Sequence, residues 1–266
     1  MADRKVLRKT ALFNPSFVFT IAFKANLQKI NFQLWLSLYN VLFMSDPVMQ
    51  NLKFYSKREE KANYMTHAFG VLMAVVATIV LLNRAIAADN AWAIVAYSVF
   101  GFGMLACMLS STIYHYVQKP KTKAVLRHFD HGNIYVLIAS SYSPFTLILM
   151  RNEGLWGWGI FILIWLSALI GIGFNFGTLK ATNHLKTASY VLMGMIVLIA
   201  IKPLIDVALA QDCLSVLYWL GAGGVFYIAG SFFYALAKHE FVHAVFHVFV
   251  LLGLACHIVA AYLIPL

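Results

Sequence analysis

Charged side chains are scarce in this chain of 266 residues, where Asp, Glu, Lys and Arg make up 11% of the sequence and hydrophobic residues 62%. Soluble domains carry roughly 25% charged residues, so the composition excludes an ordinary water-soluble protein. The three cysteines, Cys107, Cys213 and Cys256, form no Cys-x-x-Cys motif. This spacing excludes a disulfide framework and a cysteine-based metal site, and we expect all three to be small packing residues.

Long uncharged stretches take the place of the missing charges. Six of them contain no Asp, Glu, Lys or Arg and reach the ~18–20 residues that cross a bilayer core: residues 64–82, 90–118, 131–150, 154–179, 213–237 and 241–266. A seventh, residues 187–207, ends with Lys202 and Asp206, which are four residues apart and can form an ion pair. We predict an all-α fold, a polytopic seven-transmembrane helix bundle whose short loops make neighbouring helices antiparallel.

The net charge of +10 follows this topology, so it does not indicate nucleic-acid binding. Seventeen of the twenty Lys and Arg precede the first span or lie in loops on the same side, against Arg84, Arg151 and Lys202 on the other. The positive-inside rule then predicts a cytoplasmic N-terminus and an outward C-terminus. We expect an integral membrane protein whose partners are membrane lipids, with no nucleic acid.

Residues 1–58 are predicted to be a cytoplasmic or interfacial extension, separate from the membrane domain of residues 59–266. Residues 17–43 are rich in aromatics, but polar residues such as Lys24 and Gln28 interrupt them, as is typical of an interfacial amphipathic helix. The alternative is that translation starts at Met44 or Met49 and that the upstream residues are not native. Both interpretations are compatible with the sequence.

Four polar side chains fall at the ends of predicted spans that the topology brings to one depth. His115 closes the second span, Asp130 opens the third, and His243 and His247 open the seventh, each at the cytoplasmic end. Such groups are costly in hydrocarbon unless they are paired or bind a metal. Because residues four apart share a helix face, His243 and His247 can bind one ion, and His115 would supply a third nitrogen.

This donor set predicts one catalytic zinc ion. Three neutral imidazoles with an open position are typical of such zinc, whose bound water becomes nucleophilic near neutral pH. Imidazoles also suit copper, iron and nickel. Asp130 could hold and deprotonate the water, and Ser111, one turn before His115, could orient a ligand or donate a hydrogen bond to substrate.

The other histidines are expected to pack between helices. His257 lies about 15 Å beyond His247 on the same predicted helix, at ~1.5 Å per residue, which is too far to share the ion. The remaining five are predicted to hydrogen-bond to neighbouring helices: His67, His128, His131, His184 and His239.

The same motifs resemble the hemolysin III family, the bacterial branch of the progestin and adipoQ receptors. They are Ser111-x-x-x-His115, residues 127–131 around Asp130, and His243-x-x-x-His247, supported by residues 59–70, 140–146 and 201–204. The resemblance covers roughly residues 59–266. It implies a bacterial plasma (inner) membrane protein with a cytoplasmic N-terminus, a zinc held by the three histidines, and Asp130 holding the metal-bound water.

Three functions are compatible with these observations. The first is a zinc-dependent hydrolase of a membrane lipid amide or ester, with Asp130 as general base and then acid. The second is a non-enzymatic sensor or regulator of membrane homeostasis, with zinc as a structural clasp. The third is a pore-forming haemolysin, which the apolar spans disfavour because they offer no evident polar lumen. A structural zinc prefers a closed fourth ligand, so Asp130 favours the hydrolase.

Overall fold

The computed structural model describes residues 55–176, 183–235 and 239–266. The predicted interfacial helix at residues 17–43 and the alternative start sites Met44 and Met49 lie outside the described residues, as does the side chain of His184.

Every regular element of the described residues is helical, and seven segments are long and apolar enough to cross a membrane. Five segments are single helices: α2 (Lys57–Ala87), α3 (Ala91–Tyr116), α5 (Trp156–Phe176), α8 (Leu214–Ala235) and α9 (Val242–Leu263). The other two are composite: α4 (Pro120–Pro144) with η2 (Phe145–Leu149), and α6 (Asn183–Gly194) with η3 (Met195–Ala200) and α7 (Ile201–Ala210). The predicted all-α architecture with seven spans is therefore confirmed.

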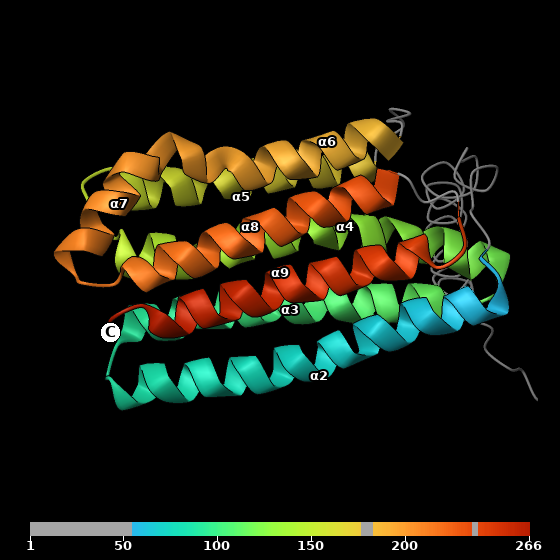
Figure 1. Ribbon diagram of the computed structural model, residues 1–266, viewed down its shortest axis with the longest axis horizontal. Helices are drawn as coiled ribbons and strands as arrows, with labels where there is room; N and C mark the ends of the chain where they lie inside the picture. The colour runs from blue at the N-terminus through green and yellow to red at the C-terminus, as the bar shows by residue number, and fades with distance from the viewer. Residues whose placement is uncertain (1–54, 177–182, 236–238) are drawn as a thin grey trace, which may run out of the picture. The chain divides into compact units, whose positions relative to one another are not determined.

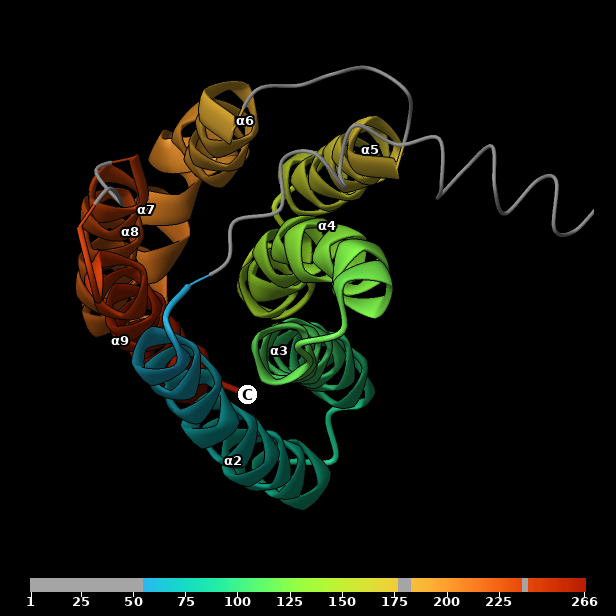
Figure 2. The same cartoon turned by 90° about the vertical axis from the view of Figure 1, so that its right-hand side faces the viewer.

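Successive helices run antiparallel and follow one another around the bundle (Figures 1 and 2). Helix α2 packs on α3, α3 on α4 and α4 on α5, while α8 packs on α9 and α9 returns to contact α2. This order gathers the first turns of α2, α4 and α9 and the last turn of α3 at one end of the bundle (Figure 1). We call it the histidine end, because His115, His243 and His247 lie there.

Aromatic and basic side chains gather where α3 and α5 begin, at the opposite end of the bundle. The Trp92 and Trp158 rings meet edge to face with centroids 5.4 Å apart. The Arg151 guanidinium lies 5.2 Å from the centroid of a Trp92 ring. Tryptophans at the ends of membrane spans are typical interfacial anchors.

The two composite segments change helix type near a proline. Pro144 lacks the N–H that a regular α-helix would use, and the chain continues as a π-helix in which Met150 N donates to the Phe145 carbonyl at 2.9 Å. Pro203 lies in the first turn of α7, directly after the 3₁₀ segment η3. Here the predicted ion pair is confirmed, with Lys202 Nζ 2.5 Å from Asp206 Oδ2.

Close helix packing in this bundle depends on small residues. A Cβ atom on Gly103 would lie 1.8 Å from Ser140 Oγ, and one on Gly171 would lie 2.3 Å from the Tyr135 ring. These glycines let α3 approach α4, and α4 approach α5.

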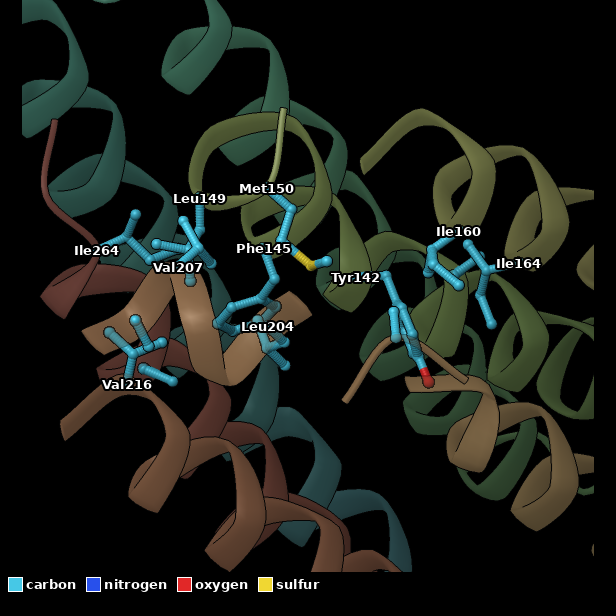
Figure 3. Packing of buried hydrophobic residues seen from close by; sticks show 14 of the residues in the cluster. Tyr142, Phe145, Leu149, Met150, Ile160, Ile164, Leu204, Val207, Val216 and Ile264 are labelled. Atoms are coloured by element: carbon cyan, nitrogen blue, oxygen red, sulfur yellow. The ribbon is translucent and has the colours of Figure 1, made fainter. Parts of the chain in front are cut away.

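Buried hydrophobic residues of η2, α5, α7 and α8 pack in one cluster. Figure 3 shows part of this cluster, including Phe145 of η2. All three cysteines are buried and free, consistent with packing roles.

Candidate metal centre

Three buried histidines converge at the histidine end. His115 is in the last turn of α3, and His243 and His247 are in the first two turns of α9. One ligand atom from each ring lies within 4.8 Å of the other two, and His115 Nε2 is 3.3 Å from His243 Nε2. The structure thus brings together the three side chains predicted as ligands.

The distance between two of these nitrogens fits a tetrahedral metal ion. Two nitrogens that each lie about 2.0–2.1 Å from a tetrahedral zinc are separated by about 3.3–3.4 Å. This separation agrees with the 3.3 Å between the facing Nε2 atoms of His115 and His243. His115, His243 and His247 could therefore hold a metal ion together.

A buried carboxylate orients His115. Glu60 Oε2 lies 2.7 Å from His115 Nδ1, and Glu60 Oε1 lies 2.8 Å from Lys123 Nζ. An ionised carboxylate only accepts hydrogen bonds, so Nδ1 carries the proton and Nε2 is left to bind an ion. The fully buried Lys123 ammonium also donates to the Tyr114 and Val117 carbonyls at 3.0 and 3.3 Å, at the end of α3.

Helix α2 orients His247 in a similar way. His247 Nδ1 lies 3.2 Å from the Asn63 carbonyl oxygen and 3.2 Å from Thr66 Oγ1. The Thr66 hydroxyl itself donates to the Asn63 carbonyl at 2.8 Å, so His247 Nδ1 is the donor and Nε2 is the nitrogen left for an ion. The His67 ring stacks on His247 with centroids 3.7 Å apart and planes 14° apart.

His243 is positioned by the loop before α9 and by Tyr55. Phe241 has a left-handed backbone with φ 64°, which is costly for a bulky residue, and its N–H donates to Glu59 Oε1 at 3.0 Å. Glu59 also forms a capping box with Ser56 at the start of α2. The Tyr55 ring stacks on His243 with centroids 5.0 Å apart. Burial raises the pKa of the Tyr55 hydroxyl above its usual range, so this ring stays neutral.

Asp130 and Ser111, the predicted catalytic residues, lie beside the histidines. Both line a cavity of about 230 Å³ that His243 and His247 also line. The Ser111 side chain, which is almost fully buried, lies beside the Asp130 carboxylate. Among the described residues, the side chains whose ligand atoms lie close enough together to share a metal ion are the three histidines, and Asp130 is not in this group. Asp130 therefore neighbours the candidate metal centre and lies outside the group of three histidines.

The remaining histidines differ in their surroundings. His128 Nδ1 lies 3.0 Å from the Asn175 carbonyl of α5, as expected for a packing histidine. His67 differs from that expectation: it lines the cavity, and neither ring nitrogen has a hydrogen-bond partner among the described residues. His131 also lines the cavity, and His239 is exposed.

Sequence reasoning missed the Glu60–Lys123 pair. The signal that points to Glu60 is its spacing from Asn63 and His67, which places the three side chains on one face of α2. The uncharged stretch begins only at Tyr64, whereas α2 begins at Lys57. A search for uncharged stretches therefore leaves Glu60 out of the predicted span, although its carboxylate is buried through its pairing with Lys123.

A family model described as Haemolysin-III related matches residues 55–258 of the chain. The chain belongs to this family. The matched region contains the three histidines, Ser111 and Asp130. The resemblance inferred from the sequence motifs is confirmed, and membership of the family agrees with the seven spans of a multi-pass membrane protein.

Curated relatives from bacteria and mammals are similar over most of their length. The Hemolysin-3 homolog of Bacillus subtilis (strain 168) is 39% identical over 201 residues, which are 76% of this chain and 92% of the relative. Hemolysin-3 of Bacillus cereus is 37% identical over 198 residues, 74% and 88% of the two chains. The Monocyte to macrophage differentiation factor of Homo sapiens is 29% identical over 205 residues, 75% and 81% of the two chains.

Proposed function

We propose that this protein is a zinc-dependent hydrolase that cleaves an amide or ester bond of a membrane lipid. The observation that carries the proposal is a buried cluster of three histidines that borders an apolar cavity, beside a carboxylate that is not a ligand. A metal with a coordination position open to substrate is typical of catalytic sites, whereas structural zinc sites are closed.

The metal would be held by His115, His243 and His247 through their Nε2 atoms, since Nδ1 is occupied by Glu60 on His115 and by the Asn63 carbonyl on His247. When bound, zinc polarises a carbonyl group and lowers the pKa of a water molecule toward neutrality. The two Nδ1 hydrogen bonds hold both rings in the tautomer that this role requires.

The proton transfers are assigned to Asp130. Its carboxylate accepts the proton of the attacking water and then delivers it to the departing amine or alkoxide, so it ends the cycle ionised. Ser111 lies beside this carboxylate on the cavity wall, where its hydroxyl can orient it. Both side chains line the cavity, where a substrate carbonyl can reach them.

The cavity supports a lipid as substrate. Most of its lining is apolar, including Ile134, Leu137 and Val250, and it extends from the histidines to Ile160 and Leu204. An acyl chain fills such a space, while the few polar groups at one end fix the bond to be cleaved. With the expected orientation, the substrate would enter from the cytoplasmic leaflet.

The alternatives are less well supported. A structural clasp would need a closed fourth ligand, and the metal group among the described residues has three. The name Hemolysin-3 belongs to the two Bacillus relatives, but a conducting pore needs a polar lumen. The cavity wall in the described residues is mostly apolar, which favours a lipid-binding site over a pore.

The proposal is tested by release of fatty acid from lipids. Purified full-length protein in vesicles is loaded with zinc and given a panel of lipid amides and esters, and free fatty acid is followed by mass spectrometry. We expect release that a strong chelator abolishes and added zinc restores, with Lys202→Ala, which alters an exposed ion pair, behaving as wild type. No release from any amide or ester by the zinc-loaded protein, or release insensitive to the chelator, would contradict it.

A further inference from the structure

A second pair of polar side chains lies in the wall of the same cavity, far from the candidate metal centre. His257 is ten residues beyond His247 on α9, about 15 Å along the helix. Its ring meets the Tyr227 ring of α8 edge to face, with centroids 5.2 Å apart and planes 76° apart. Both residues line the cavity. The cavity therefore has one polar group of residues at the histidine end and another deep among its apolar residues.

Two glycines make room for this pair. A Cβ atom on Gly223 of α8 would lie 2.3 Å from His257 Cδ2 and 2.6 Å from its Nε2. A Cβ atom on Gly253 of α9 would lie 2.9 Å from Tyr227 Cε1. Each ring thus lies against a glycine of the opposite helix, and the missing side chains of these glycines leave room for both rings. Apolar side chains could fill the same space without placing polar atoms among hydrocarbon.

The polar atoms of the pair are only partly satisfied by the described part of the chain. No hydrogen bond of regular geometry reaches the Tyr227 hydroxyl or either nitrogen of His257. The Leu220 backbone interacts with His257, and its carbonyl can accept a hydrogen bond from only the donor nitrogen of the ring. A neutral imidazole also has one acceptor nitrogen, so that nitrogen still lacks a donor. By contrast, the cavity-lining hydroxyls of Ser141 and Thr146 donate to carbonyls of their own segment at 2.8 and 2.9 Å.

A pair of this kind needs a hydrogen-bonding ligand, because unsatisfied polar groups within a membrane are costly and mark functional sites. The charged residues that line the cavity are Asp130, in the third turn of α4, and Lys186, in the first turn of α6, both toward the histidine end. The Phe145 ring lies near the pair, with its centroid 6.4 Å from that of His257, and Leu204 and Leu220 also line the cavity. The ligand group at the pair is therefore neutral and carried on a largely apolar molecule.

We propose that Tyr227 and His257 bind a hydroxyl or carbonyl group on the hydrocarbon chain of the lipid ligand. The hydroxyl of Tyr227 donates to that oxygen, and the acceptor nitrogen of His257 receives its proton when the group is a hydroxyl. About 15 Å is half of the ~30 Å hydrocarbon core, so the oxygen sits well along the chain and not next to the bond to be cleaved. The placement of that bond rests on the proposed hydrolase function; binding itself needs no turnover.

The test compares three fatty acids as probes: octadecanoic acid, the same acid hydroxylated near the middle of its chain, and the same acid hydroxylated beside the carboxyl. Their affinities for zinc-loaded full-length protein are measured by displacement of a fluorescent fatty acid. We expect wild type to bind the mid-chain hydroxy acid about 5- to 10-fold more tightly than the other two, the gain expected for about one net hydrogen bond. Tyr227→Phe and His257→Leu should reduce that preference while octadecanoic acid binds as before.

Tyr227→Phe keeps the ring that Gly253 accommodates and removes only one oxygen, so the test remains decisive if His257→Leu does not fold. Tyr218→Phe, at an exposed position on the same helix, is the matched control and should keep the full preference. Equal affinity of wild type for the three acids, as expected if water alone occupies the pair, would overturn the proposal. So would a preference that survives both substitutions. Failure of every lipid amide and ester to be cleaved would overturn the hydrolase function but not this binding preference.

Discussion

Asp130→Asn should leave the metal bound and slow the release of fatty acid by about 100- to 10,000-fold, the usual contribution of a general base. The amide of asparagine has nearly the same size and can still hydrogen-bond to Ser111, but it cannot take a proton from water. Because Asp130 lies outside the group of three histidines, metal content should stay at the wild-type level. The measurements are the initial rate of fatty acid release and the metal content of the same preparation.

This substitution also separates the hydrolase from the sensor. A structural clasp between α3 and α9 depends on the histidines alone, so a sensor would keep its function in Asp130→Asn. Asp206→Asn, which breaks the exposed ion pair with Lys202, serves as the matched carboxylate control. A wild-type rate in Asp130→Asn would show that Asp130 is not the base.

Glu60→Gln should weaken zinc binding by about 10- to 100-fold, the usual effect of removing the partner that orients a metal-bound histidine. The neutral amide accepts a weaker hydrogen bond from His115 Nδ1 and leaves the fully buried Lys123 without its counter-charge. Affinity is measured by competition with a chelator of known strength. The visible spectrum of the cobalt-loaded protein reports separately on the geometry of the three nitrogens.

The double variant Glu60→Gln with Lys123→Met distinguishes positioning from folding. It removes both members of the buried pair, so its folded yield should recover relative to Glu60→Gln alone. Its zinc affinity should stay low, because His115 still lacks a charged acceptor. Wild-type affinity in either variant would show that Glu60 does not position His115.

The number of spans and the convergence of the three histidines can be predicted from sequence for a simple reason. Uncharged stretches of membrane length identify the helices, and an antiparallel order brings the end of the second span and the start of the seventh to one depth. His115, His243 and His247 stand out because each is a polar residue at such a point. The site could be predicted because the topology inferred from the charge distribution places all three histidines at the same end of the bundle.

Other features depend on tertiary contacts that the sequence pattern does not contain. The pairing of Glu60 with Lys123 buries two charges that a search for uncharged stretches discards. The cavity and the pairing of Tyr227 with His257 arise from how α8 and α9 pack at Gly223 and Gly253. A proline indicates that the α-helix changes near Pro144, but the hydrophobic periodicity of the sequence does not predict that a π-helix follows.

Metal content by elemental mass spectrometry, on detergent-purified wild type beside His247→Ala and Lys202→Ala, tests the central claim most directly. A site of three imidazoles predicts about one zinc ion per chain in wild type and in Lys202→Ala, and its loss in His247→Ala. An absence of bound metal in wild type, or an unchanged metal content in His247→Ala, would contradict a metal centre built from these three histidines.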